Sequence, residues 1–373
     1  MKAAAVQLGK RVLQGSLAGV ERVVRAKQDL SAERLRGMKN FLLLQYPGAL
    51  GTAIHATPLV AALRAAVPDC RIVVGASGFG LDVFRGNPYV DKLMETASPL
   101  VNLRAAIEPL RGVFGGEEYA TLLSVGNQRM PVVLQAMMVG ASLRVGFSTA
   151  PVLMHLPLEF DREMSQIANN LRILRALGHS VEVTEPLIVP SEDDRKIAGK
   201  LLGGGGGPMV VMVTQTSVTQ RKGWRAERFA AVGRYLRERY GARLVFVGTA
   251  GESAAIDSIR QMLDFETLSP AGKTSIGVLG AVMERCAVGV TLDTGSLHIG
   301  RGVGLPMVVI APAWSPEVEW LPVGNPKYRI LKNLTMDAPA PADYVIDEVS
   351  VEEVCGAVDE LMSQRTETES SRA

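Results

Sequence analysis

The chain has 373 residues, of which 47% are hydrophobic and 21% are charged, and its formal net charge is +2. These values are typical of a globular protein of about two domains, and they exclude a disordered or fibrous chain. Three dispersed cysteines without a C-x-x-C pair indicate neither a disulfide framework nor a zinc site and fit a reducing compartment, and no apolar run reaches the length of a membrane span.

Residues 1–38 are expected to form a basic amphipathic extension. Residues 1–40 carry nine Lys or Arg against three acidic residues, a charge of +6, which leaves −4 for the rest of the chain. This distribution argues against a general nucleic-acid binder, which carries its basic surface on the folded domain. Apolar residues recur at helical spacing: Leu13, Leu17, Val20 and Val24. The pattern favours equally a helix on an anionic membrane or partner helix and a solvated helix packed on the protein.

Residues 39–185 are predicted to form a first α/β domain, because short apolar runs alternate with helical patterns. The expected strands are Phe41–Gln45, Arg71–Val74, Tyr119–Val125 and Leu143–Phe147, and the clearest helices are Thr52–Val67 and Arg162–Leu177. This alternation predicts a parallel sheet with helices on both faces. The string GASGFG at 75–80 lacks the glycine spacing of a dinucleotide site and is interpreted as a loop.

The same pattern begins again in residues 186–350, which are predicted to form a second domain. Five consecutive glycines, Gly203–Gly207, indicate a flexible loop. The expected strands are Met209–Val213, Leu244–Val247, Ala287–Leu292 and Met307–Ile310, and the expected helices are Glu227–Arg239 and Ile276–Glu284. Residues 351–373 are expected to form a closing helix, Val351–Met362, and a disordered tail.

The most informative segment is AVGVTLDTGSLHIGRGVGLPMVVIAP at 287–312. A strand leads into a short polar turn, and a helix begins there, so the carboxyl end of a strand meets the positive end of a helix. This arrangement favours an anion such as phosphate. The candidate residues are Asp293, Thr294, Gly295, Ser296 and His298. The alternative is that Asp293 or Thr294 only caps the helix.

A second candidate segment, TQTSVTQRKGWRAERF at 214–229, follows the strand Met209–Val213. Its first part offers hydroxyl groups suited to phosphate oxygens, from Thr214, Thr216 and Ser217. Lys222 supplies a positive charge that stabilises a diphosphate leaving group. The alternative is an ordinary polar loop with a solvated lysine.

Several other site classes are not supported by the sequence. There is no D-x-D motif, and the four histidines are too dispersed to predict a metal site. The string GKTS at 272–275 lacks the first glycine of a P-loop, since Thr267 occupies its position. A G-x-S-x-G nucleophile elbow is also missing, so we expect neither a metal nor a hydrolase of that class.

The chain resembles glycosyltransferase family 9, the heptosyltransferases, from about residue 40 to residue 322. In the first domain the resemblance rests on FLLLQYPGALGTAIHATPLVAALRAAVPDCRIVV and on NPYVD at 87–91. In the second it rests on KGWRAERFAAV at 222–232 and on AGKTSIGVLGAVMERCAVGVTLDTGSLHIGRGVGLP. The ordered set of these segments is far more specific than any one of them.

The resemblance implies a GT-B type fold, with two Rossmann-like doubly wound domains facing a central cleft, the first for the acceptor and the second for the donor. It implies an inverting, metal-independent transfer, without a cofactor, from a nucleotide-sugar such as ADP-heptose to a lipid-linked or saccharide acceptor in lipopolysaccharide biosynthesis. Lys222 matches the family's diphosphate-binding lysine and Asp293 its donor-binding acidic residue. Thr294, Gly295, Ser296 and His298 match its phosphate loop. The expected location is cytoplasmic, peripheral on the inner face of the membrane.

One departure from the family pattern affects the mechanism. Family members usually carry Asp after A-L-G in the first loop, as the base that activates the acceptor, and here Thr52 follows Gly51. A threonine hydroxyl is a poor base at neutral pH, although it can cap a helix. We therefore expect His55 to act as the base, with Thr52 orienting the acceptor or capping the helix. The alternatives are a family member that binds nucleotide-sugar or assists assembly without turnover, and a related epimerase or hydrolase.

Overall fold

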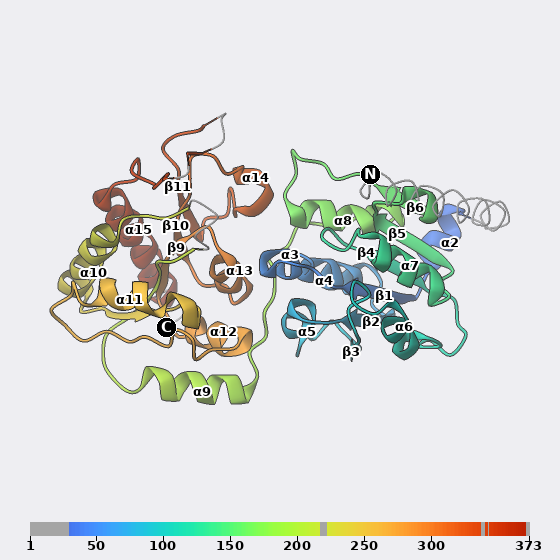
Figure 1. Cartoon of the computed structure of the whole chain (residues 1–373), viewed down its shortest axis with the longest axis horizontal. Helices are drawn as coiled ribbons and strands as arrows, with labels where there is room; N and C mark the ends of the chain where they lie inside the picture. Colours follow the sequence, from blue (N-terminus) through green and yellow to red (C-terminus); the bar gives the residue numbers. More distant parts are fainter. Residues whose placement is uncertain (1–29, 217–221, 337–339, 342, 371–373) are drawn as a thin grey trace, which may run out of the picture. The chain divides into compact units, whose positions relative to one another are not determined.

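The computed structural model describes residues 30–216, 222–336, 340–341 and 343–370. The chain divides into two compact units, Met1–Pro186 and Leu187–Ala373 (Figure 1). Both units are α/β, and each contains a single parallel sheet. The predicted apolar stripe at residues 13–24 and the candidate Ser217 lie outside the described residues.

The first unit contains a six-stranded sheet of order β3-β2-β1-β4-β5-β6, and all its strand pairs are parallel. The strands are β1 (Asn40–Gln45), β2 (Arg71–Ala76), β3 (Lys92–Glu95), β4 (Ala120–Leu123), β5 (Leu143–Phe147) and β6 (Leu156–Leu158). The helices are α2 (Ala32–Gly37), α3 (Leu50–Ile54), α4 (Thr57–Ala66), α5 (Phe79–Phe84), α6 (Leu103–Ile107), α7 (Met130–Met138) and α8 (Gln166–Ala176).

Both faces of this sheet are covered, which explains why β1 is apolar throughout. Leu42 and Leu44 point into a core that includes Ile107 and Val133, from the α6 and α7 layer. Phe41 and Leu43 are equally buried and alternate with them, so they belong to the opposite face. A strand buried on two faces has a continuous apolar sequence rather than an alternating one.

The predicted helix Thr52–Val67 is in fact two helices, α3 and α4. Pro58 lacks the N–H that would bond to the carbonyl of Ile54, and the Thr57 hydroxyl donates to that carbonyl instead, at 2.8 Å. The prediction that Thr52 is a helix N-cap is also wrong, because the N-cap of α3 is Ala49. His55 is the C-cap of α3 rather than a residue of a first helical turn.

The segment 75–80, predicted to be a loop, is a loop only in its middle. Gly75 still belongs to β2 and Gly80 already belongs to α5, so only two residues separate the strand from the helix. A Cβ on Gly80 would lie 2.4 Å from the carbonyl oxygen of Gln45. The absence of a side chain at Gly80 therefore lets α5 pack directly against the end of β1.

The second unit contains a five-stranded parallel sheet of order β11-β10-β9-β7-β8. Its strands are β7 (Met209–Val213), β8 (Arg243–Phe246), β9 (Val288–Leu292), β10 (Met307–Ile310) and β11 (Tyr328–Leu331). Its helices are α9 (Glu192–Leu202), α10 (Ala226–Tyr240), α11 (Ser253–Arg260), α12 (Ile276–Glu284), α13 (Gly295–Gly302), α14 (Glu317–Trp320) and α15 (Val351–Ser370).

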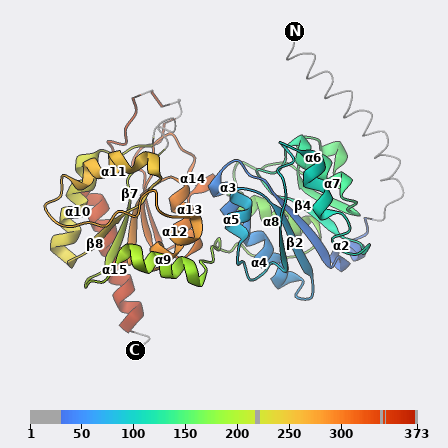
Figure 2. The same cartoon turned by 60° about the horizontal axis from the view of Figure 1, so that its bottom comes forward.

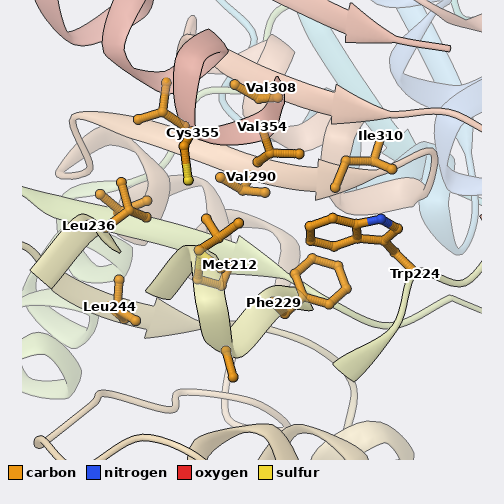
Figure 3. Packing of buried hydrophobic residues seen from close by; sticks show 14 of the residues in the cluster. Met212, Trp224, Phe229, Leu236, Leu244, Val290, Val308, Ile310, Val354 and Cys355 are labelled. Atoms are coloured by element: carbon orange, nitrogen blue, oxygen red, sulfur yellow. The ribbon is translucent and has the colours of Figure 1, made fainter. Parts of the chain in front are cut away.

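Helices cover both faces of this second sheet as well. On one face α10, α11 and α15 close a core that includes Met212, Leu244 and Ile310 (Figure 3). Helix α12 packs against both α9 and α13, the three helices lie together in Figure 2, and α13 also contacts β9. Two packed faces explain the apolar sequences of β7, β9 and β10, which allowed them to be predicted.

Both ends of the described chain differ from the predictions. Helix α15 continues to Ser370, so the tail predicted to be disordered from Ser363 onward is helical to that point. Within the predicted extension, α2 belongs to the first unit: its Leu35 is buried and its Arg34 pairs with Glu118. None of the helices in the described residues combines the length and apolar composition needed to cross a membrane.

Candidate functional site

The candidate site lies at the carboxyl ends of three neighbouring strands of the second unit. In the register of the sheet, Val213 of β7 is opposite Thr291 of β9, and Leu292 is opposite Ile310 of β10. The segments that follow these strands therefore leave the sheet at one edge. This edge is where ligands bind in open α/β sheets.

A buried ion pair joins the two predicted segments. Lys222 Nζ lies 2.6 Å from Asp293 Oδ2, and the two side chains are 13% and 3% exposed. The Ser315 hydroxyl donates to the same Asp293 oxygen at 3.3 Å. Lys222 Nζ also lies 5.4 Å from the centroid of the Trp314 ring, within the range of a cation–π contact. The structure thus brings together residues that are 71 positions apart in the sequence.

The turn after β9 leaves the first amide groups of α13 without a side-chain cap. The N-cap is Thr294, which makes no side-chain capping hydrogen bond, and the Asp293 carboxylate bonds to Lys222 and Ser315 instead. Thr294 is thus the N-cap by position, but neither it nor Asp293 makes the side-chain hydrogen bond that the capping alternative requires. The Thr294 hydroxyl oxygen is buried and has no hydrogen-bond partner within the described residues. A free helix N-terminus beside an unpartnered hydroxyl and a lysine can bind an anion.

The other predicted donor residues lie along the same edge. Thr214 directly follows β7, is buried, and its hydroxyl accepts a hydrogen bond from the Gln215 amide at 3.3 Å. Thr216 follows two residues later in the same loop and is the last described residue before position 217. Gly295 and Ser296 form the first turn of α13 and are partly exposed.

Sequence reasoning missed the contribution of the segment after β10. Besides Trp314 and Ser315 it brings in Lys332, whose Nζ donates to the Ser315 carbonyl at 2.9 Å and lies 3.4 Å from Glu317. The Lys332 side chain is 7% exposed, so its contacts with Ser315 and Glu317 stabilise the segment after β10 from the buried side. The available signal was positional: β10 was predicted as a further strand of the same parallel sheet, so the loop that follows it had to leave at the same edge as the loop after β9.

His298 is a packing residue with a neutral side chain. It is 4% exposed, and its ring centroid lies 5.8 Å from that of Trp320. Burial lowers the pKa of His298 to about 4, although the nearby Asp293 carboxylate opposes this shift. At neutral pH it therefore adds no positive charge to the site.

The low pKa of His298 predicts a loss of stability in mild acid. The pKa is about 4 in the folded protein, against 6.5 for an ordinary histidine, so between these values the unfolded chain binds a proton that the folded chain does not. The free energy of unfolding should fall as the pH drops from 6.5 to 4, by about 3 kcal/mol from this residue. We expect denaturant titrations across this range to show a shallower pH dependence for His298→Gln than for the wild type. Parallel curves for the two proteins would contradict the assignment.

The two residues predicted to act on the acceptor are in the first unit and are poorly accessible. Thr52 lies within α3, is 8% exposed and packs against Gly126, where a Cβ would lie 2.2 Å from its methyl carbon. His55 is 1% exposed, and its carbonyl accepts a hydrogen bond from Asn170 at 2.9 Å. In this conformation an acceptor hydroxyl could not reach the His55 ring.

The described residues contain no group of three or more His, Cys, Asp or Glu side chains placed to hold a metal ion. Cys70, Cys286 and Cys355 are free and buried.

Comparison with known proteins gives consistent results at the level of family and fold. A family model described as glycosyltransferase family 9 (heptosyltransferase) matches residues 135–336. Lipopolysaccharide heptosyltransferase 3 of Escherichia coli is 21% identical over 342 residues, which cover 85% of this chain and 97% of that protein.

Two solved structures resemble the chain over most of its length. One is a glycosyl transferase family 9 protein from Veillonella parvula, with a TM-score of 0.74 and 21% identity over 90% of this chain and 99% of that one. The other is ADP-heptose lps heptosyltransferase II of E. coli, with a TM-score of 0.70 and 18% identity over 88% of this chain and all of that one (100%). The predicted α/β fold of GT-B type is thereby confirmed.

Proposed function

Because this chain belongs to glycosyltransferase family 9, we propose that it transfers a heptose-like sugar from a nucleotide-sugar, best represented by ADP-heptose, to a lipid-linked or saccharide acceptor. The names of the relatives support both the sugar and the donor, since they are heptosyltransferases of lipopolysaccharide and one is named for ADP-heptose. Lipopolysaccharide biosynthesis is accordingly the process in which we expect the protein to act.

The observation that carries this proposal is the group of anion-binding features in the second unit. Lys222 is held beside Asp293. Asp293 directly precedes Thr294, the N-cap residue of α13, whose side chain makes no capping hydrogen bond. A diphosphate at this point would receive an ammonium group, a hydroxyl and free backbone N–H groups. We infer that this is the donor site.

These groups also suggest how the reaction proceeds. As the acceptor oxygen bonds to the anomeric carbon, the bond to the diphosphate breaks and negative charge accumulates on the leaving group. Lys222 and the end of α13 would stabilise that charge. We therefore propose a single inverting displacement that requires neither a metal ion nor a cofactor.

The decisive experiment is a thermal-shift panel of ADP-, UDP- and GDP-sugars, followed by a turnover assay with and without EDTA. A ligand that prefers the native state raises its stability, so we expect ADP-heptose to give the largest shift. Transfer should continue in EDTA and give a product of inverted anomeric configuration. A shift by none of the donors would refute the assignment of the donor site.

A second function is favoured by one observation, the threonine at position 52. A family member without a working base would bind the nucleotide-sugar as a binding or assembly subunit. Donor binding without either transfer or hydrolysis would identify this case. Hydrolysis without an acceptor would instead indicate a related hydrolase.

We also propose that the N-terminal residues bring the enzyme to the inner face of the cytoplasmic membrane. Residues 1–29 contain six Lys or Arg and two acidic residues, and each basic residue near an anionic surface contributes about 1 kcal/mol. Deleting residues 1–29, but keeping α2, should strongly reduce co-sedimentation with vesicles containing phosphatidylglycerol. Neutral vesicles serve as the control, and equal binding by both proteins would contradict the proposal.

A further inference from the structure

A pocket of about 450 Å³ lies at the amino-terminal end of the sheet in the second unit. It is lined by the glycine run from Gly203 to Gly206, by Arg237 in the last turn of α10, and by Arg243, the first residue of β8. Arg243 is opposite Met209, the first residue of β7, so the pocket and the candidate site are at opposite ends of the same strands. We call it the glycine-loop pocket, and the proposed function gives it no role.

The glycine run packs closely at two positions. A Cβ on Gly207 would lie 2.6 Å from the carbonyl oxygen of Gly241. A Cβ on Gly205 would lie 3.0 Å from both Cζ and Nε of Arg243, so the guanidinium lies against the backbone of the loop. The angle φ is positive at Gly203, Gly205 and Gly207 but not at the two glycines between them. A backbone whose hand alternates in this way turns successive N–H groups toward an anion.

The N–H groups at the centre of the loop are available to a ligand. Gly203 still donates to the Gly199 carbonyl at 3.0 Å and so completes the last turn of α9. The N–H groups of Gly204, Gly205 and Gly206 have no acceptor among the described residues, and all three glycines are exposed and line the pocket. These donors resemble those of the glycine-rich loops that bind phosphate.

Arg243 is held in place but keeps donors for a ligand. Its Nη2 donates to the Leu202 carbonyl at 2.6 Å, and the packing against Gly205 restrains the plane of the guanidinium. Nε and Nη1 make no hydrogen bond within the part of the chain that the structure describes. A restrained guanidinium with free donors is well suited to phosphate oxygens.

The charge of the pocket is positive. Lys200 and Arg237 line it together with Arg243, and Glu266 is the only acidic residue among the described residues that line it, which leaves a charge of +2. Cations near the carboxyl ends of α9 and α10 also offset the helix dipoles. That role requires neither an open pocket nor a loop of glycines with free N–H groups.

We propose that the glycine-loop pocket binds a phosphate ester that carries hydroxyl groups, at a site separate from the proposed donor site. The phosphate oxygens accept hydrogen bonds from the loop and from Arg243, and Lys200 and Arg237 neutralise the charge. The volume is within the range of about 300–1,000 Å³ that is typical of small-molecule sites, so an organic group also fits. Glu266 accepts a hydrogen bond from a hydroxyl of that group. A soluble sugar phosphate and the head group of phosphatidylglycerol both have this chemistry.

The test measures the binding of glucose 6-phosphate and of inorganic phosphate by calorimetry. The full chain carries Lys222→Ala together with Asp293→Asn, so that the cation of the proposed donor site does not contribute. We expect one site per chain, and tighter binding of glucose 6-phosphate than of inorganic phosphate. Co-sedimentation with phosphatidylglycerol vesicles is the second probe. Vesicle binding that depends on the loop, without binding of glucose 6-phosphate, would identify the lipid head group as the source.

Two neighbouring glycines provide a matched pair of variants. Gly205→Ala places a Cβ against the Arg243 guanidinium at a residue with a φ of +149°, so it should weaken binding by about tenfold or more. Gly206→Ala should keep the affinity, because a Cβ there meets nothing within 4 Å and its φ is not positive. Thermal unfolding without ligand shows whether either variant is destabilised.

The cations are tested without changing the backbone. Arg237→Gln should also weaken binding by about tenfold, since it removes a charge-assisted contact from an exposed side chain. Lys196→Gln is the control: this lysine is on α9, one turn before Lys200, is 71% exposed and pairs with Asp193 outside the pocket. It should keep full affinity.

The proposal is overturned if neither glucose 6-phosphate, inorganic phosphate nor the vesicles bind in a way that depends on the loop. Equal affinity in wild type, Gly205→Ala and Arg237→Gln has the same meaning. With the donor site intact, Gly205→Ala should bind ADP-heptose as the wild type does. Loss of ADP-heptose binding in this variant would contradict a separate site, whereas a wild type that binds glucose 6-phosphate but no nucleotide-sugar refutes only the proposed function.

Discussion

Replacing Lys222 by alanine is expected to weaken the binding of ADP-heptose by about 10- to 150-fold. A hydrogen bond to a charged group is worth about 1.5–3 kcal/mol, and Lys222 is the cation that we assign to the diphosphate. Isothermal titration calorimetry of wild type and variant measures the difference. An unchanged affinity would exclude this location for the donor.

Stability and binding can be separated because Lys222 has a buried partner. In Lys222→Ala the carboxylate of Asp293, which is 3% exposed, loses its cation, and this can cost up to about 3–5 kcal/mol of stability. In the double variant with Asp293→Asn the uncompensated charge is gone. We expect the double variant to recover much of the stability but not the donor affinity. Recovery of affinity together with stability would mean that Lys222 acts only through the fold.

Replacing Trp224 by alanine is expected to lower both the stability of the second unit and its donor affinity. The Trp224 ring is 5% exposed, meets Phe229 edge to face at a centroid distance of 4.8 Å, and donates to the Val349 carbonyl at 3.0 Å (Figure 3). Truncating such a side chain costs about 3–5 kcal/mol. Trp224 lies two residues after Lys222, so its loss should also release the lysine loop.

The matched control for Trp224 is Leu236→Ala, in the same core but farther along α10 (Figure 3). It should cost about 2–5 kcal/mol of stability and leave donor affinity unchanged. All three tryptophans of the chain, at positions 224, 314 and 320, belong to the second unit. Tryptophan fluorescence during urea unfolding therefore follows this unit, and Trp314 and Trp320 still report on it in Trp224→Ala. A similar loss of affinity in both variants would indicate a general effect of destabilisation.

The central strands were predictable because burial on both faces of the sheet leaves little choice of residue type along them. Strands β1, β7 and β10 are buried on both faces, and their apolar runs gave their positions to within a residue. Strands β3 and β6 carry no such run: β3 reads KLME with exposed ends, and β6 is three residues with a proline at its centre. Their pairing is decided by neighbouring strands rather than by their own sequences.

The proposed donor site could be predicted in part for a different reason. Asp293 and Lys222 were identifiable because each lies in a segment that follows the carboxyl end of a predicted strand, β9 or β7. Their direct contact depends on the fold of the loop between β7 and α10, which no local pattern determines. The partners Trp314 and Ser315 were missed because aromatic stacking and a single hydroxyl contact leave no periodic signal.

The break between α3 and α4 limited the prediction for the acceptor side. A continuous helix would have placed Thr52 and His55 on one exposed first turn. Pro58 instead breaks the helix between α3 and α4, and His55 is buried in the interior. A proline within an apolar helical pattern was visible in the sequence, but the direction of the chain after the break was not.

The contacts of Lys222 also determine when its freedom of movement is lost. A lysine side chain in water gives up as much as about 2 kcal/mol of rotamer entropy when it is fixed in one position. Here Asp293 and Trp314 already restrain the ammonium group, so most of this entropy is lost during folding. At the donor site that we propose, an arriving diphosphate would meet a cation that hardly needs to be ordered, and a larger part of the contact energy would remain as affinity.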